Sequence, residues 1–165
     1  MAPERYRHAV HPNAELLARF YAAFARRDAG AMAACYHAEA TFSDPVFPRL
    51  DRAATCAMWR MLCARARDLA IVTSGISADA ERGQAHWDAT YTYSGSGRRV
   101  LNRIDATFEF RDGLIARHDD RFDLYRWMRQ AFGAKGVLVG WLPPVQHALR
   151  AQAAKALASN RAKGK

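Results

Sequence analysis

The sequence predicts an α+β domain in which one curved antiparallel sheet packs on helices from the amino-terminal part of the chain. Hydrophobic residues follow helical spacing up to about residue 65, and they follow the period-2 alternation of strands between residues 71 and 124. Turn-forming dipeptides separate the alternating segments. The length of 165 residues suits one domain, and a hydrophobic content of 50% is enough for a core. Helices followed by a run of strands indicate the α+β class.

The first predicted helix runs from Ala14 to about Arg27, with Asn13 as its cap. Its buried stripe has the i, i+3, i+4, i+7 spacing of an amphipathic helix and consists of Leu17, Phe20, Tyr21 and Phe24. A second, short helix is expected after it. One side of that helix consists of Met32, Cys35 and Tyr36.

A brief strand is expected to end at Asp44. Residues 39–44 are too few and too rich in strand formers for another helix, and Pro45 holds the residue before it in an extended conformation. Asp44 therefore lies at a strand end beside apolar side chains. There it can take part in chemistry, or it can only initiate a turn.

A third helix is predicted from Arg52 to about Arg65, capped by Asp51 and covering a pocket. Two strands are expected next, at 71–76 and 84–93. One face of the longer strand consists of Trp87, Ala89, Tyr91 and Tyr93, and the other consists of His86, Asp88, Thr90 and Thr92.

The last two strands carry most of the polar residues that are placed for chemistry. Alternate residues from 100 to 110 form an apolar face on which Asn102 is the one polar member. Asp112-Gly113 tolerates positive φ, so residues 114–124 are expected to run back antiparallel. His118 and Asp120 then share the apolar face of the return strand. An imidazole and a carboxylate are costly there unless they are paired or used.

Each polar candidate has two interpretations. His118 and Asp120 are either a catalytic or ligand-orienting pair, or a buried hydrogen-bonded pair that steadies the sheet. Asn102 either contacts a ligand or satisfies a backbone group on the next strand. Five aromatic residues are expected to line the pocket: Phe20, Trp59, Trp87, Tyr91 and Phe122. No set of candidate ligands has metal-binding spacing, so we predict neither a metal nor a cofactor.

The net charge of +9 is unevenly distributed. From Gln146 onward the chain has five basic residues and no acidic one, which leaves +4 for the rest. Because Pro143-Pro144 precedes a weakly amphipathic stretch, residues 134–165 are predicted as a basic, alanine-rich helical extension of a domain at 13–133. This tail is either a solvated helix or a surface for phosphates or lipids. The rest of the chain does not suggest nucleic-acid binding.

The sequence shows no signal-like run and no apolar stretch of membrane-spanning length. The three cysteines, Cys35, Cys56 and Cys63, lack metal-ligand spacing and are expected to be reduced core residues. We therefore expect a cytoplasmic protein without membrane insertion.

From residue 13 to residue 133 the order of elements resembles the superfamily of nuclear transport factor 2, ketosteroid isomerase and limonene-epoxide hydrolase. The likeness is greatest to its SnoaL-like polyketide cyclase branch. It rests on the strand end Ser43-Asp44-Pro45 between two helices and on the closing sequence His-Asp-Asp-Arg-Phe-Asp-Leu at 118–124. The resemblance implies a cone that holds a small apolar ligand, and a homodimer through the outer face of the sheet.

Asp44-Pro45-Val46 is similar to the context of the general base in ketosteroid isomerase. Phe20 falls where that enzyme has its oxyanion-hole tyrosine, with Tyr21 about 100° further around the helix. Asp105, which resembles the third member of that site, lies on the face opposite Ile104 by alternation.

The sequence at 120–123, Asp-Arg-Phe-Asp, resembles the strand end of limonene-epoxide hydrolase. The Arg-x-Asp partner motif of that enzyme corresponds to His86-Trp87-Asp88. SnoaL-like cyclases use a pocket aspartate and histidine in acid–base chemistry, and the residues in these places are Asp120 and His118.

The sequence thus predicts a cofactor-independent pocket enzyme of isomerase or cyclase type, acting on an apolar carbonyl-bearing or polycyclic compound. Asp44 and Asp120 are the predicted base and acid, His118 sets their protonation, and Asn102 donates a hydrogen bond to a substrate oxygen. Two carboxylates in one dry pocket repel, so one is expected to hold a proton near neutral pH. The alternatives are an epoxide hydrolase in which Asp120 activates water, and a non-catalytic ligand-binding or adaptor domain.

Overall fold

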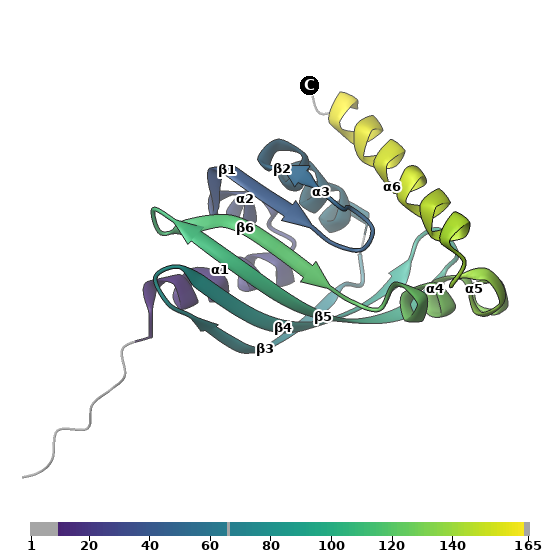
Figure 1. The fold of residues 1–165 in the computed structure, drawn as a ribbon, viewed down its shortest axis with the longest axis horizontal. Helices are drawn as coiled ribbons and strands as arrows, with labels where there is room; N and C mark the ends of the chain where they lie inside the picture. Colours follow the sequence, from purple (N-terminus) through teal and green to yellow (C-terminus); the bar gives the residue numbers. More distant parts are fainter. Residues whose placement is uncertain (1–9, 66, 164–165) are drawn as a thin grey trace, which may run out of the picture.

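The computed structural model describes residues 10–65 and 67–163, and it combines a curved sheet with helices (Figure 1). The amino-terminal residues 1–9, where no signal-like run was found, lie outside the described residues. The helices are α1 (Pro12–Ala25), α2 (Ala29–Ala34), α3 (Arg52–Arg65), α4 (Leu124–Phe132), α5 (Ala134–Val139) and α6 (Pro143–Lys163). The strands are β1 (Tyr36–Ser43), β2 (Leu50–Asp51), β3 (Ala70–Ala78), β4 (Arg82–Tyr93), β5 (Arg98–Arg111) and β6 (Leu114–Arg121).

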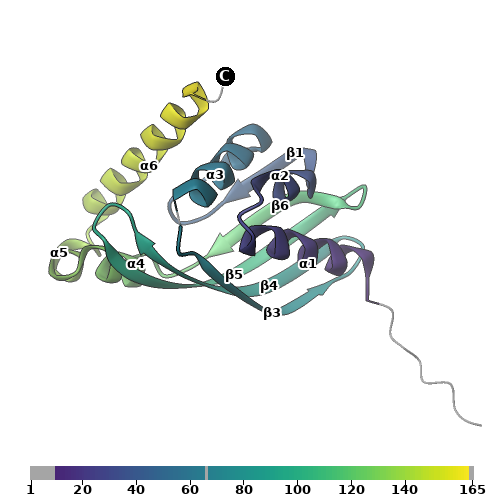
Figure 2. The same ribbon diagram turned by 180° about the vertical axis from the view of Figure 1, so that it is seen from behind.

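The six described strands form one sheet in the order β2-β1-β6-β5-β4-β3. The helices α1, α2 and α3 cover one face of this sheet, as Figure 2 shows from behind. All neighbouring strands are antiparallel except β1 and β6, which run parallel. The α+β class is confirmed, whereas the expectation of a purely antiparallel sheet was wrong for this pair. Alternation along a strand does not reveal the direction of its neighbour.

Several elements begin and end where local chemistry predicted. Asp51 caps α3 by accepting a hydrogen bond from Ala54 N at 2.8 Å, and Asp123 caps α4 by accepting one from Arg126 N at 2.9 Å. The β5–β6 turn has φ of 53° at Asp112 and 71° at Gly113, the positive values expected of Asp-Gly.

The start of the chain differs from the prediction. The cap of α1 is His11, whose Nδ1 accepts from Asn13 N at 3.1 Å. The Asn13 amide instead donates to the carbonyl of Asp79 at 2.8 Å and so ties α1 to the β3–β4 turn. Tyr36 was expected in the second helix but opens β1, because α2 already ends at Ala34 with Cys35 as its C-cap.

The return strand β6 contains an irregularity that simple alternation does not include. Its register against β5 shifts between Glu109 and Phe110. As a result Ile115 and His118, three residues apart, are both fully buried. Beyond the shift His118 lies opposite Phe108, and Asp120 lies opposite Ala106.

The carboxy-terminal helix α6 packs against α3, and Figures 1 and 2 show the two helices side by side. Leu149 and Leu157 are buried, and Arg150 Nε donates to the carbonyl of Pro45 at 2.8 Å. Of the two interpretations of the tail, a purely solvated helix is therefore wrong. None of the helices in the described residues is long and apolar enough to cross a membrane.

Candidate active site

One cavity of about 270 Å³ lies between the helix-covered face of the sheet, α3 and α6. Its walls are mainly apolar and aromatic, as in many ligand sites. Three of the four predicted catalytic residues line it: Asp44, Asn102 and Asp120. Four of the five predicted aromatic residues also line it, namely Trp59, Trp87, Tyr91 and Phe122.

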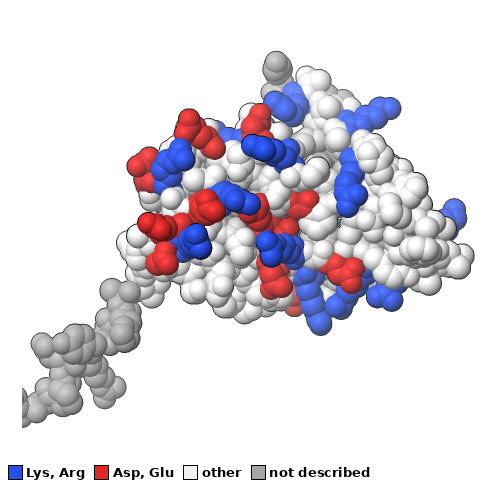
Figure 3. Space-filling model, viewed as in Figure 1, with Lys and Arg blue, Asp and Glu red and all other residues white. Residues whose placement is uncertain are grey.

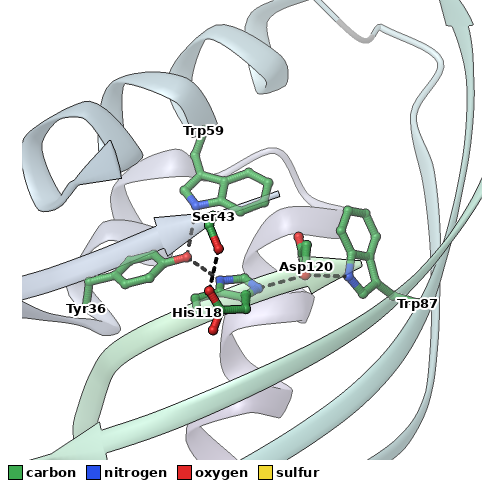
Figure 4. Close-up of polar contacts among 7 residues, drawn as sticks. Tyr36, Ser43, Trp59, Trp87, His118 and Asp120 are labelled. Carbon is green, nitrogen blue, oxygen red and sulfur yellow. Dashed lines mark hydrogen bonds and ion pairs between the residues drawn. The ribbon is translucent and has the colours of Figure 1, made fainter. Parts of the chain in front are cut away.

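Asp120 lies at the inner end of this cavity and is only 5% exposed. Its Oδ1 lies 2.9 Å from His118 Nε2 and 3.5 Å from Trp87 Nε1. Figure 4 shows the two rings approaching the carboxylate from opposite sides. The carboxylate is therefore held in one orientation by two N–H groups.

His118 does not line the cavity, contrary to the prediction, because it lies behind Asp120 and is fully buried. Its Nδ1 lies 2.7 Å from the hydroxyl of Tyr36, which in turn accepts from Trp59 Nε1 at 3.0 Å (Figure 4). Since Trp59 can only donate, the Tyr36 hydroxyl is best satisfied by donating to Nδ1. The hydrogen of His118 is then on Nε2, where it is donated to Asp120.

Asp44 reaches the cavity from the loop after β1. Its Oδ1 accepts from Val46 N at 2.7 Å and from Phe47 N at 2.5 Å, so it also forms the turn of the alternative interpretation. Burial raises the pKa of Asp44 to about 7, the Phe47 N–H partly opposes this, and the charge of Asp120 raises it further. Asp44 can therefore gain or lose a proton near neutral pH.

Asn102 and Tyr91 add polar groups to the wall formed by β4 and β5. The amide of Asn102 makes no side-chain hydrogen bond with the described residues, which leaves it available to a ligand. The hydroxyl of Tyr91 accepts from Trp127 Nε1 at 2.7 Å, and burial raises its pKa to about 12. Tyr91 is therefore a neutral hydroxyl at physiological pH.

Phe20 does not line the cavity, although it was predicted to. It is fully buried and meets His118 edge to face, with ring centroids 5.6 Å apart. Phe24, which lies one turn further along α1, lines the cavity instead. The adjacent Tyr21 has a buried hydroxyl without a hydrogen-bond partner among the described residues, and its pKa is raised by burial and by the charge of Asp120.

The sequence did not reveal the part that α6 plays in the cavity. This helix contributes Leu149, Gln152, Ala153 and Ala156 to the lining. Its weak helical periodicity was visible in the sequence, but nothing local indicated what its apolar side would contact. Arg65, at the end of α3, is another lining residue that was not predicted.

The polar motif His86-Trp87-Asp88 is divided between the two faces of the sheet. Trp87 lines the cavity, whereas His86 lies on the outer face, 2.7 Å from Asp105 and 3.2 Å from Asp88. These carboxylates raise the pKa of His86. Asp88 therefore does not supply a second carboxylate to the cavity, contrary to the analogy with limonene-epoxide hydrolase.

A larger, open depression of about 690 Å³ lies elsewhere on the molecule. Three of its charged side chains pair with one another, with Arg117 2.6 Å from Asp119 and 3.6 Å from Glu109. Among the residues that the structure describes, no cluster of three histidine, cysteine or acidic residues is arranged to hold a metal ion. The smaller, apolar cavity is therefore the candidate site.

Comparisons with known proteins agree with this fold. No curated protein matches the chain. A proposed polyketide cyclase from Xanthomonas campestris pv. campestris has 25% identity and a TM-score of 0.59, covering 73% of this chain and 96% of its own. An NTF2-like protein of unknown function from Burkholderia pseudomallei has 17% identity and a TM-score of 0.67, and the match covers 75% of this chain and 100% of that protein. An LEH-like epoxide hydrolase from M. tuberculosis has 18% identity and a TM-score of 0.60, covering 80% and 96%.

The last two likenesses support the fold alone, because their sequence identities are low. The family model of the SnoaL-like domain matches residues 17–118, which is more than half of the chain. This range includes β4 and β5, whose side chains line the cavity, and it ends before Asp120 and α6. The chain therefore belongs to the SnoaL-like family, within the NTF2-like fold.

Proposed function

We propose that the protein is a cofactor-independent enzyme that transfers a proton on a small, apolar, carbonyl-bearing compound, as an isomerase or cyclase does. The observation that carries this proposal is that Asp44 and Asp120 line one apolar cavity while the pKa of Asp44 is about 7. A group that titrates near the working pH is suited to general acid–base catalysis.

The surroundings of the two carboxylates differ, and this supports different roles. Asp120 accepts hydrogen bonds from the N–H groups of His118 and Trp87, so its carboxylate is oriented to act as the base. Asp44, with its raised pKa, supplies the proton, so the proposed roles are the reverse of the base and acid predicted from the sequence. The amide of Asn102, which makes no side-chain hydrogen bond within residues 10–65 and 67–163, can donate to the carbonyl oxygen as negative charge develops there. In this scheme Asp120 removes a proton beside the carbonyl and Asp44 delivers one to the oxygen or to a second carbon.

The cavity also limits the size of the compound. Its volume of about 270 Å³ is just below the range for ligand pockets, which is roughly 300–1,000 Å³. We therefore favour a compound with one or two rings over a larger polycyclic one.

The test is deuterium exchange at the carbon beside the carbonyl of small cyclic ketones, with the bicyclic 2-tetralone as the first probe. The wild-type protein is expected to accelerate exchange, and Asp120→Asn is expected to slow it by roughly 10²–10⁴-fold. Asp119→Asn is the matched control because Asp119 precedes Asp120 but pairs with Arg117 instead of lining the cavity. No acceleration by the wild type for any ketone that binds would contradict catalysis.

A thermal melt of Asp120→Asn separates the enzyme from a non-catalytic binding module. The specific observation in favour of a binding module is that both ring nitrogens of His118 already have partners. If Asp120 serves only as a structural acceptor, the substitution should destabilise the protein by about 1–3 kcal/mol. If Asp120 is held for chemistry, the variant should be as stable as the wild type or more so.

The epoxide hydrolase alternative uses the same two carboxylates, with Asp120 activating water and Asp44 protonating the epoxide oxygen. It is less well supported because Asp88 points away from the cavity. Turnover of a cyclic epoxide without exchange on any ketone would favour it.

A further inference from the structure

The end of the molecule that carries α5 exposes a group of large apolar side chains. Four residues form it, and we call them the apolar knob: Val137, Leu138, Val139 and Trp141. Their exposed fractions are 50%, 71%, 39% and 59%. The indole N–H of Trp141 donates to the carbonyl of Leu138 at 3.2 Å, so the only polar atom of this side chain is satisfied within the turn. Contiguous exposed apolar side chains of this kind mark interaction surfaces.

The knob is held firmly by α4. The hydroxyl of Tyr125 donates to the carbonyl of Val137 at 2.9 Å. Gly136 packs so closely that a Cβ there would lie 2.0 Å from the carbonyl oxygen of Met128. The apolar side chains are therefore presented on a fixed support.

The charge of this part of the chain has one sign. After Asp123 the sequence contains eight basic residues and no acidic one, whereas residues 1–123 contain 17 basic and 16 acidic residues. Figure 3 shows acidic side chains gathered over the sheet, while the end that carries α5 is uncharged with basic side chains at its edge. Arg126 and Arg129 of α4 and Lys135 of α5 precede the knob in sequence, and they form no ion pair with the described carboxylates.

We propose that the apolar knob, together with Arg126, Arg129 and Lys135, docks the protein on the surface of an anionic lipid membrane. Apolar and tryptophan side chains enter the boundary between head groups and acyl chains, and basic residues beside them are attracted to anionic head groups. Each basic residue near such a surface strengthens binding roughly fivefold.

Two other partners fit these observations less well. A two-fold contact with a second copy would bring two equally basic surfaces together, and no described acidic residue follows Asp123 to offset the repulsion. Nucleic acid would pair with the basic residues but would leave aliphatic Val137 and Leu138 without an apolar environment.

The experiment is flotation of the full chain with vesicles of phosphatidylcholine, with and without phosphatidylglycerol. The wild type is expected to bind the anionic vesicles at least roughly tenfold more strongly and to be released by high salt. The double substitution Leu138→Ser, Trp141→Ser is expected to lose roughly tenfold or more of this binding. Val72→Ser is the matched control, because Val72 is 67% exposed on β3, outside the knob.

The contribution of charge is tested in the same assay. Lys135→Glu is expected to weaken binding to the anionic vesicles. Arg103→Glu is the control, because Arg103 lies on the outer sheet face, and it is expected to leave this binding unchanged. If Trp141→Ser lowers the melting temperature, Leu138→Ser alone replaces the double variant. Binding that is equal in the knob variants and the wild type would overturn the proposal. So would a knob-dependent dimer by light scattering, or knob-dependent retention on RNA, in the absence of vesicle binding.

Discussion

The half-buried carboxyl of Asp44 makes the stability of the protein depend on pH in a defined direction. Its pKa is about 7 in the folded protein and near 3.8 in an unfolded chain, so the folded state binds the proton more tightly. The stability that this protonated carboxyl contributes is fully present below about pH 4 and is lost as the pH rises to about 7.

We therefore expect Asp44→Asn, which keeps the acceptor for Val46 N and Phe47 N, to gain stability relative to the wild type as the pH rises. The gain should be about 1.4 kcal/mol per pH unit between about pH 4 and 7. Urea unfolding at several pH values measures it. Asp123→Asn is the control, because Asp123 forms a similar cap but is exposed. If the free energy of unfolding changed with pH by the same amount in the wild type and in Asp44→Asn, Asp44 would be shown to be a solvated carboxyl.

Tyr36 is expected to control the orientation of His118. Tyr36→Phe removes the oxygen between Trp59 and His118, which leaves two buried ring nitrogens without a partner. The expected loss is about 1–3 kcal/mol in urea unfolding, together with a change in the ¹⁵N shifts of His118. Tyr125→Phe removes a more exposed hydroxyl and is expected to cost less than about 1 kcal/mol. Unchanged ¹⁵N shifts in Tyr36→Phe would argue against the assigned tautomer.

For single residues, the alternation of apolar and polar side chains along β5 and β6 was enough to place Asn102 and Asp120 on the cavity side. The hydrogen bond between Tyr36 and His118 was not predictable, because it depends on the parallel pairing of β1 with β6 and on the register shift in β6. Both are long-range features that leave no pattern within a single strand.

Among the elements, α5 depends on a glycine that a helix would not otherwise favour. Gly136→Ala would place a methyl group against the backbone of Met128, so α4 and α5 would have to separate. We expect a loss of roughly 1–3 kcal/mol in thermal or urea unfolding. Gly30→Ala is the matched change in α2, where the nearest atom is 3.5 Å away, and it should stabilise the helix by up to about 1 kcal/mol. Similar melting temperatures for the two variants would contradict the close packing.

The elements themselves were largely predictable from caps, turns and periodicity. Asp51, Asp123 and the Asp112-Gly113 turn act within a few residues, so the sequence around them is sufficient. The packing of α6 on α3 was not predictable, since α6 is alanine-rich and begins 78 residues after α3 ends. The division at residue 133 stays a prediction, because α6 shares the cavity with the preceding elements.

The predicted homodimer through the outer sheet face would be held together by charged side chains. That face carries intermixed acidic and basic side chains, as Figure 3 shows, whereas Trp87 and Tyr91 of β4 face the cavity. A dimer formed there would rely on ion pairs, which salt screens. We expect light scattering to give twice the chain mass at micromolar concentration in low salt, and a lower mass in high salt. A monomeric mass at low salt would contradict the predicted dimer.

Since α6 forms a wall of the cavity, the rate at which a ligand leaves is expected to follow the motion of this helix. The wall is attached through a few buried side chains and the bond from Arg150 to Pro45, next to Asp44. Local detachment of such a terminal helix requires less free energy than unfolding of the sheet. The residence time of a bound compound is therefore expected to shorten when Arg150 is replaced by Ala, and amide exchange within α6 is expected to slow when the cavity is filled.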